Sequence, residues 1–191
     1  MNSSLDTVSK ADTIAQKTVY SILFSIAFAH LLNDLLQAVI PAAYPILKEN
    51  FNLTFTRIGL IALAYQLAAS ILQPMVGLYT DKRPKPFSQI FGMLFTLTGI
   101  VFLSYASSFS MIIVSVVLVG IGSSIFHPEA SRISFLASGG KRGLAQSIFQ
   151  LGGNAGTAIG PLLVALIVVP NSQYYIIWFV VVAILGLLVL S

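Results

Sequence analysis

Four polar residues occur at helical spacing within an otherwise apolar segment. His30, Asn33, Asp34 and Gln37 follow the pattern i, i+3, i+4 and i+7, so a helix presents all four on one face. Imidazole and carboxylate groups side by side can hold and exchange a proton near neutral pH. If the segment crosses a membrane from Tyr20, His30 lies roughly 15 Å deep, at 1.5 Å per residue. A charge at that depth costs from about 3 to over 10 kcal/mol, so we expect this face to line a cavity.

A purely structural role for these residues is the alternative, with Asn33 and Asp34 holding neighbouring helices together. Polar contacts between membrane helices contribute only roughly 0.6 kcal/mol on average. One Asn or Gln would suffice for that role. Four polar groups that include an ionisable pair favour a cavity with proton chemistry.

A second polar group lies in the sequence SSIFHPEASR, toward one end of another apolar segment. His127 and Glu129 are two positions apart and do not share a helical face, so they do not form the two-histidine motif of zinc proteases. Pro128 removes a helical hydrogen bond between them. We expect His127 and Glu129 to be functional, with Glu129 competing with Asp34 as the proton carrier. For Arg132 an interfacial anchor is the favoured interpretation.

A third segment combines a polar face with a row of small residues. Gln146, Gln150 and Asn154 follow the spacing i, i+4 and i+8. Small residues at every fourth position let two helix backbones approach closely, which suits a tightly packed, moving gate. These packing residues are Gly152, Gly156, Gly160 and the adjoining Pro161.

The elements that carry these groups are predicted to be membrane-spanning helices. The chain is 57% hydrophobic and only 8% charged, whereas a soluble domain is about a quarter charged. Its basic residues are scattered over short loops, which argues against a nucleic-acid partner. About 20 apolar residues cross a bilayer core, whereas β-barrel strands need only about ten alternating ones. Six continuous runs qualify: about 19–46, 56–80, 87–106, 109–131, 142–169 and 174–191.

Orientation follows from the basic residues in the connections. With the N-terminus in the cytoplasm, eight Lys and Arg residues lie inside and only Lys48 and Arg57 outside. The polar start of the chain lacks a signal-peptide pattern. We therefore expect residues 1–18 to form a cytoplasmic tail and residues 19–191 a six-helix bundle. The last run has no polar flank, which predicts a fragment ending within the sixth helix, the first half of a longer protein.

The connection between the second and third runs carries the most specific motif. Its sequence GLYTDKRPKP resembles the signature G-x-x-x-D-[RK]-x-G-[RK]-[RK] of the major facilitator superfamily, with prolines at two signature positions. The matching residues are Gly77, Asp81, Lys82 and Lys85. The resemblance implies a role for Asp81 in gating. The run GTAIGP, Gly156 to Pro161, resembles the antiporter signature G-x-x-x-G-P, although the glycine pair that follows it there is missing.

A closer resemblance extends over nearly all 191 residues. The sequences AHLLNDLLQAVIPAAYPILK, GSSIFHPEASR and GLAQSIFQLGGNAGTAIGP are similar to those of the fosmidomycin-resistance proteins, a family of bacterial drug exporters. The resemblance implies an all-α membrane protein of twelve helices in two six-helix halves, of which this chain would be the N-terminal half. In this fold the first and fourth helices of each half line the cavity.

The resemblance also implies a function, a proton-driven antiporter in the bacterial inner membrane that exports a small compound. Basic residues at a cavity mouth would suit an anionic substrate such as a phosphonate. We expect protons, a small-molecule substrate, lipid and the missing half as partners, with no cofactor and no metal. An importer of a small anion or metabolite on the same scaffold stays open as an alternative. An intramembrane enzyme or receptor is disfavoured, because no serine lies in a nucleophile motif.

Overall fold

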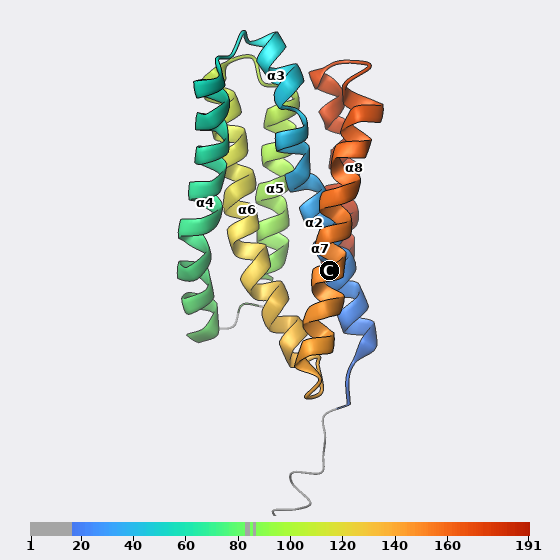
Figure 1. The fold of residues 1–191 in the computed structure, drawn as a ribbon. Coiled ribbons are helices and arrows are strands. Elements are labelled where there is room, and N and C mark those ends of the chain that lie inside the picture. Colours follow the sequence, from blue (N-terminus) through green and yellow to red (C-terminus); the bar gives the residue numbers. More distant parts are fainter. Residues whose placement is uncertain (1–16, 83–84, 86) are drawn as a thin grey trace, which may run out of the picture.

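The computed structural model describes residues 17–82, 85 and 87–191, and over these residues it is a bundle of long helices (Figure 1). No strand occurs in the part described. The elements are α2 (Tyr20–Ala42), α3 (Tyr44–Asn50), α4 (Phe55–Lys82), α5 (Ser88–Ser104), α6 (Phe109–Leu136), α7 (Arg142–Leu163), a π-helix η1 (Val164–Val168), a 3-10 helix η2 (Gln173–Trp178) and α8 (Phe179–Leu190). Each predicted apolar run corresponds to one of the long helices, with η2 and α8 together forming the last.

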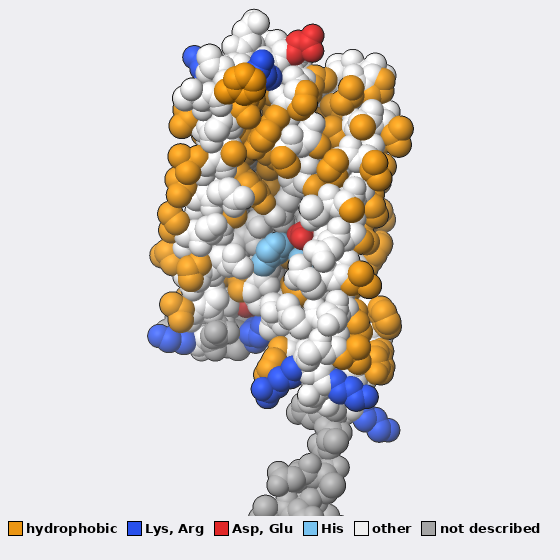
Figure 2. Space-filling model, in the orientation of Figure 1, with side chains coloured by type: hydrophobic (Ala, Val, Ile, Leu, Met, Phe, Trp, Pro, Cys, Tyr) orange, Lys and Arg blue, Asp and Glu red, His pale blue; other side chains and the backbone are white. Residues whose placement is uncertain are grey.

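Five helical segments are long and apolar enough to cross a membrane, and α5 is a shorter apolar helix of 17 residues. The all-α, six-helix prediction is therefore confirmed. The end of α4, the start of α5 and the α6–α7 connection lie at the same end of the bundle as the start of α2, and α3 lies at the opposite end (Figure 1). Lys and Arg side chains gather at the former end, and hydrophobic side chains cover much of the flank between the two (Figure 2).

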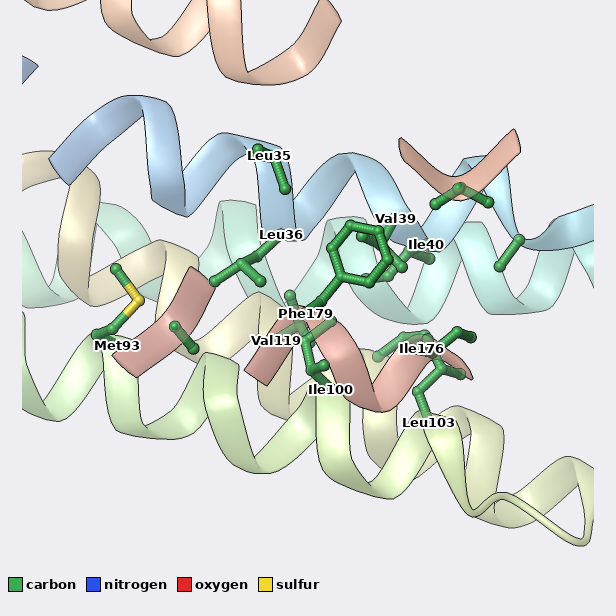
Figure 3. Close-up of a cluster of buried hydrophobic side chains, with 14 of the residues drawn as sticks. Leu35, Leu36, Val39, Ile40, Met93, Ile100, Leu103, Val119, Ile176 and Phe179 are labelled. Atoms are coloured by element: carbon green, nitrogen blue, oxygen red, sulfur yellow. The ribbon is translucent and has the colours of Figure 1, made fainter. Parts of the chain in front are cut away.

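The apolar core lies between α2, α5, α6 and α8. Leu36 and Ile40 of α2 meet Ile100 of α5, Val119 of α6 and Phe179 of α8, all at most 2% exposed (Figure 3). These side chains come from helices far apart in the sequence. The core thereby fixes the rotation of α2 about its own axis and turns its polar stripe toward α6 and α7.

Glycines set the closest helix contacts. Along α7, Gly152, Gly156 and Gly160 lie against the backbone of α2, and a Cβ built at any of them would collide with Ala27, Leu31 or Leu35 backbone atoms. The clash recurs every four residues on both helices, so the two backbones run in contact over several turns. Gly92, Gly99 and Gly122 do the same between α5 and α6.

Helix α4 packs differently from the others. It makes extensive contact only with α6, and just 11% of its most apolar window is buried. Its exposed side chains are mainly large and apolar, among them Leu63, Ile71 and Leu78. A helix with this surface is stable only in lipid or against further protein.

A π-helix interrupts the regular winding at the end of α7. The π-helix Val164–Val168 begins three positions after Pro161, and Val169 N donates to Val164 O at 3.0 Å. Single π-turns insert one extra residue into a helix and often occur at functional sites. Here the π-turn leads into the connection to η2.

Candidate functional site

The Asp34 carboxylate is contacted by histidines of two helices. His30 Nε2, one turn earlier on α2, lies 3.2 Å from Asp34 Oδ2, and His127 Nε2 of α6 lies 3.5 Å from Oδ1. The His30 side chain is 4% exposed, whereas those of Asp34 and His127 are 16% and 26% exposed. A histidine and an acidic side chain appear about halfway along this open face (Figure 2). The site thus combines one buried imidazole with two groups that solvent can reach.

The orientation of His30 is fixed by α7. Its Nδ1 lies 2.8 Å from the Phe149 carbonyl oxygen, and its ring stacks on the Phe149 ring with centroids 3.9 Å apart. A carbonyl can only accept, so Nδ1 carries a hydrogen, and Nε2 carries one only when the ring is an imidazolium. Nε2 and Asp34 Oδ2 therefore need a proton between them, on either the ring or the carboxyl. Without it, two acceptors would face each other at 3.2 Å.

Gln37 connects Asp34 to two further helices. The Tyr65 hydroxyl of α4 donates to Gln37 Oε1 at 2.5 Å, and the Ser123 hydroxyl of α6 donates to the same oxygen at 3.1 Å. The amide is therefore oriented with Nε2 toward Asp34 Oδ1, at 3.4 Å. Asn33 Nδ2 also donates to this oxygen, at 3.2 Å. Of these two amide donors to Asp34, Gln37 is itself fixed by hydrogen bonds from other helices.

Gly153 of α7 provides the space for the His30–Asp34 pair. A Cβ there would lie 2.6 Å from His30 Nε2 and 2.7 Å from Asp34 Oδ2. Real Cβ atoms do not approach other atoms so closely, and the neighbours here are themselves fixed. Any side chain at residue 153 would therefore separate the two groups or push α7 away from α2.

A cavity of about 460 Å³ adjoins this centre. Alanine and proline side chains line it together with hydroxyl and amide groups, and no Lys or Arg occurs among the lining residues that the structure describes. One face of the Asp34 carboxylate thus opens onto a space large enough for a small molecule. The polar lining residues are Asp34, Gln37, Tyr44, Tyr65, Gln66 and Thr157.

Glu129 and Arg132 lie apart from the Asp34 centre. Glu129 is 1% exposed, and its Oε2 accepts from Arg132 NH2 at 3.0 Å. Glu129 Oε1 and Arg132 Nε have no hydrogen-bond partner among the described residues. Arg132 is thus paired within the protein, which differs from the free interfacial anchor favoured by the sequence. Of the polar residues expected on α6, only His127 lies beside Asp34.

The other predicted residues lie at the edge of the site or away from it. Gln150 Nε2 donates to Asn154 Oδ1 at 3.3 Å on the exposed face of α7. In the loop motif, a Cβ at Gly77 would lie 3.7 Å from Pro128 Cβ, and Lys82 and Lys85 are exposed. The Asp81 side chain lies outside the described residues, so its predicted gating role stays a prediction.

Four residues of the site were missed by sequence reasoning. They are Tyr65, Ser123, Phe149 and Gly153. Tyr65 and Gln66 are two adjacent polar residues in an otherwise apolar run, which could have indicated a position on α4 that faces a cavity. Phe149 contributes mainly its backbone carbonyl, and no side-chain pattern reveals such a contact.

Residues 26–191 match the family model of the Major Facilitator Superfamily. This chain belongs to that superfamily. The match covers α4 to α8 completely and α2 from Ile26 onward. The predicted family is therefore confirmed, together with the fold of one six-helix half.

Two curated relatives are similar over almost the whole chain. The fosmidomycin resistance protein of Escherichia coli (strain K12) is 51% identical over 181 residues, which are 95% of this chain and 45% of that protein. The uncharacterized MFS-type transporter YfnC of Bacillus subtilis (strain 168) is 51% identical over 173 residues, covering 91% and 42%. The chain therefore spans slightly less than half the length of these relatives.

Proposed function

We propose that this chain forms the N-terminal half of a proton-coupled transporter that exports a small compound by alternating access. The main support for this proposal is the His30–Asp34 pair, which needs a proton between His30 Nε2 and Asp34 Oδ2. Asp34 also opens onto a cavity. Membership of a transporter superfamily supplies the wider context. Intramembrane ionisable groups that face a cavity are typical of proton relays in transporters.

The geometry suggests how a proton would change the conformation. Asp34 Oδ1 on α2 lies 3.5 Å from His127 Nε2 on α6 and would attract a protonated His127 ring, and Gln37 extends the network to Tyr65 on α4. Protonation of the Asp34 carboxyl removes its negative charge. The attraction to a protonated His127 ring is then weaker, and so is the hydrogen bond that Asp34 Oδ1 accepts from Gln37. The same event would loosen three helices at once, which is what a change between inward-open and outward-open states requires.

Export of an anionic compound is supported by a relative and constrained by the cavity. The relative named as a fosmidomycin resistance protein suggests a phosphonate-like substrate. Because no Lys or Arg lines the described cavity, the countercharge would come from protonated His30 and His127 or from the second half. An importer of a small anion on the same scaffold is the alternative, and the direction of transport distinguishes the two.

The test uses the full-length protein in inverted membrane vesicles, with fosmidomycin as the probe and an imposed pH gradient. Asp34→Asn keeps the shape of the side chain but cannot titrate, so we expect uphill accumulation to fall to background while insertion is unchanged. Glu129→Gln is the matched control and should retain uphill transport. Full uphill transport by Asp34→Asn together with its loss in Glu129→Gln would move the proton site to α6.

A second experiment tests whether a metal ion binds at the same centre. One ligand atom each from His30, Asp34 and His127 lies within 4.8 Å of the others, a spacing that a single metal ion could also bridge. We expect transport to be unchanged by a chelator and to follow the pH gradient. Transport that stopped on chelation and returned with metal would contradict proton coupling at this centre.

A further inference from the structure

A second pocket lies far from the Asp34 centre, at the end of the bundle where Lys and Arg gather. It occupies about 380 Å³ between the last turns of α4 and the first turns of α5, with Ile125 of α6 as its floor. Helices α4 and α5 each pack against α6 but scarcely touch one another, which leaves this groove open. The walls include Val76, Tyr79, Phe87 and Phe91.

The walls of the groove are mainly hydrocarbon, and its polar groups at the rim are those of Tyr79 and Lys85. Its two aliphatic hydroxyl side chains bond to nearby backbone, since Thr80 donates to Val76 O at 3.0 Å and Ser88 donates to Lys85 O at 2.8 Å. Phe87 and Phe91 are 64% and 59% exposed. The interior of the groove therefore suits an acyl chain, and polar groups of a ligand would find partners only at the rim.

The rim of the groove is basic. Lys85 lines the pocket, Lys82 ends α4 two positions after Thr80, and both are exposed. Neither lysine forms an ion pair with any carboxylate that the structure describes. Tyr79, 52% exposed, belongs to the same rim. Aromatic rings beside lysines at the end of apolar helices are typical of the membrane interface, where lysines bind anionic headgroups.

We propose that this groove, the α4–α5 groove, binds an anionic phospholipid. Its acyl chain would lie against Phe91 and Ile125, and its phosphate would lie between Lys82 and Lys85. The apolar wall fits any lipid, but the two lysines select a headgroup with net negative charge. The bound lipid would cover the flank of α4 that α6 does not.

The test places a tryptophan in the groove of the full-length protein and measures quenching by brominated lipid. Trp178 is the single tryptophan of this chain, so Trp178→Phe, with any tryptophan of the rest of the protein also replaced, removes the background and Phe91→Trp supplies the probe. In nanodiscs of brominated phosphatidylglycerol mixed with phosphatidylcholine, we expect preference for the anionic lipid of about fivefold for each lysine engaged. Lys82→Gln with Lys85→Gln should reduce the preference to about one.

Phe102→Trp is the matched control, because it lies on the same helix, is 40% exposed and does not line the groove. It should show no lipid preference. Equal preference at residues 91 and 102, or a preference that survives loss of both lysines, would overturn the proposal. Absence of quenching by either lipid at residue 91 would also overturn it, since protein would then cover the groove.

Discussion

Helices α7 and α4 flank the same cavity but differ in how many neighbouring helices hold them. Helix α7 runs backbone to backbone along α2, with glycines at each contact and the His30–Phe149 hydrogen bond between them. Helix α4 meets only α6 extensively and shows most of its surface. Its one described side-chain hydrogen bond to another helix is that of Tyr65 to Gln37. The polar centre thus lies between α2, α6 and α7, and α4 reaches it through one hydroxyl while its backbone packs closely on α6 at Gly120.

This difference separates two requirements of a transporter. A proton site must keep its atoms within a few tenths of an ångström, which close packing provides. A moving helix must separate from few neighbours, and α4 has one extensive neighbour, α6. The close packing makes Gly152, Gly156 and Gly160 of α7 more sensitive to substitution than Gly59 near the start of α4.

Gly156→Leu should have the largest effect. The new side chain would meet the Leu31 carbonyl and the Leu35 amide, so we expect a loss of about 3 kcal/mol or more of stability and little folded protein. Gly59→Leu is the control, because nothing lies within 4 Å of a Cβ there, and its effect should stay within about 0.5 kcal/mol. Thermal unfolding followed by size-exclusion fluorescence measures both. Equal losses would show that the two helices are held alike.

Gly153→Ala should leave the bundle folded and damage the proton pair. Its methyl group would press on His30 Nε2 and Asp34 Oδ2, displacing them by up to an ångström. A displacement of that size can cost about 100-fold in rate. We therefore expect pH-driven transport to fall by roughly one to two orders of magnitude. The melting temperature should be nearly unchanged. Unimpaired transport would argue against a fixed His30–Asp34 distance.

Tyr65→Phe should have a smaller effect, confined to the attachment of α4. It removes one hydrogen bond to Gln37, which contributes about 0.5–1.5 kcal/mol. We expect transport rate to change several-fold while substrate affinity stays similar. Ser123→Ala is the matched control, because it removes the other donor to the same oxygen without touching α4. If both variants behaved alike, the hydroxyl would serve Gln37 and not the attachment of α4.

Single cysteines should reveal the sides of the membrane without disturbing either helix. This chain has no cysteine, so Lys82→Cys, Lys141→Cys and Thr54→Cys, each at an exposed position, can serve as probes once any cysteine of the rest of the protein is replaced. An impermeant thiol reagent added to intact cells should label residue 54 and spare residues 82 and 141. Labelling in the reverse pattern would invert the predicted orientation of the N-terminus.

The fold was predictable from sequence because its signal is local. Apolar runs of about 20 residues determine where helices cross a bilayer, and one resemblance determines how six of them are connected. The stripe of His30, Asp34 and Gln37 was predictable for the same reason, since helical spacing places these residues on one face. The pairing of α5 with α6 followed from the short connection between them.

The composition of the centre was not predictable, because it depends on how other helices are rotated. Spacing alone separates His127 from Glu129 by roughly 200° around α6, but it does not say which one faces Asp34. That choice is made by the glycine contacts of α6 with α5 and by the core around Val119. Tyr65, Phe149 and Gly153 enter the centre through tertiary contacts that leave no periodic trace in the sequence.

The π-turn at Val164–Val168 has a consequence for how such chains can vary in length. It holds one residue more than an α-helix of the same rise, so deleting one residue there would convert it to ordinary helix. The connection to η2 would absorb the change, and the glycine contacts upstream of Pro161 would keep their register. A one-residue gap at this place between homologous chains would therefore be compatible with an unchanged proton centre, whereas a gap between Gly152 and Gly160 would not.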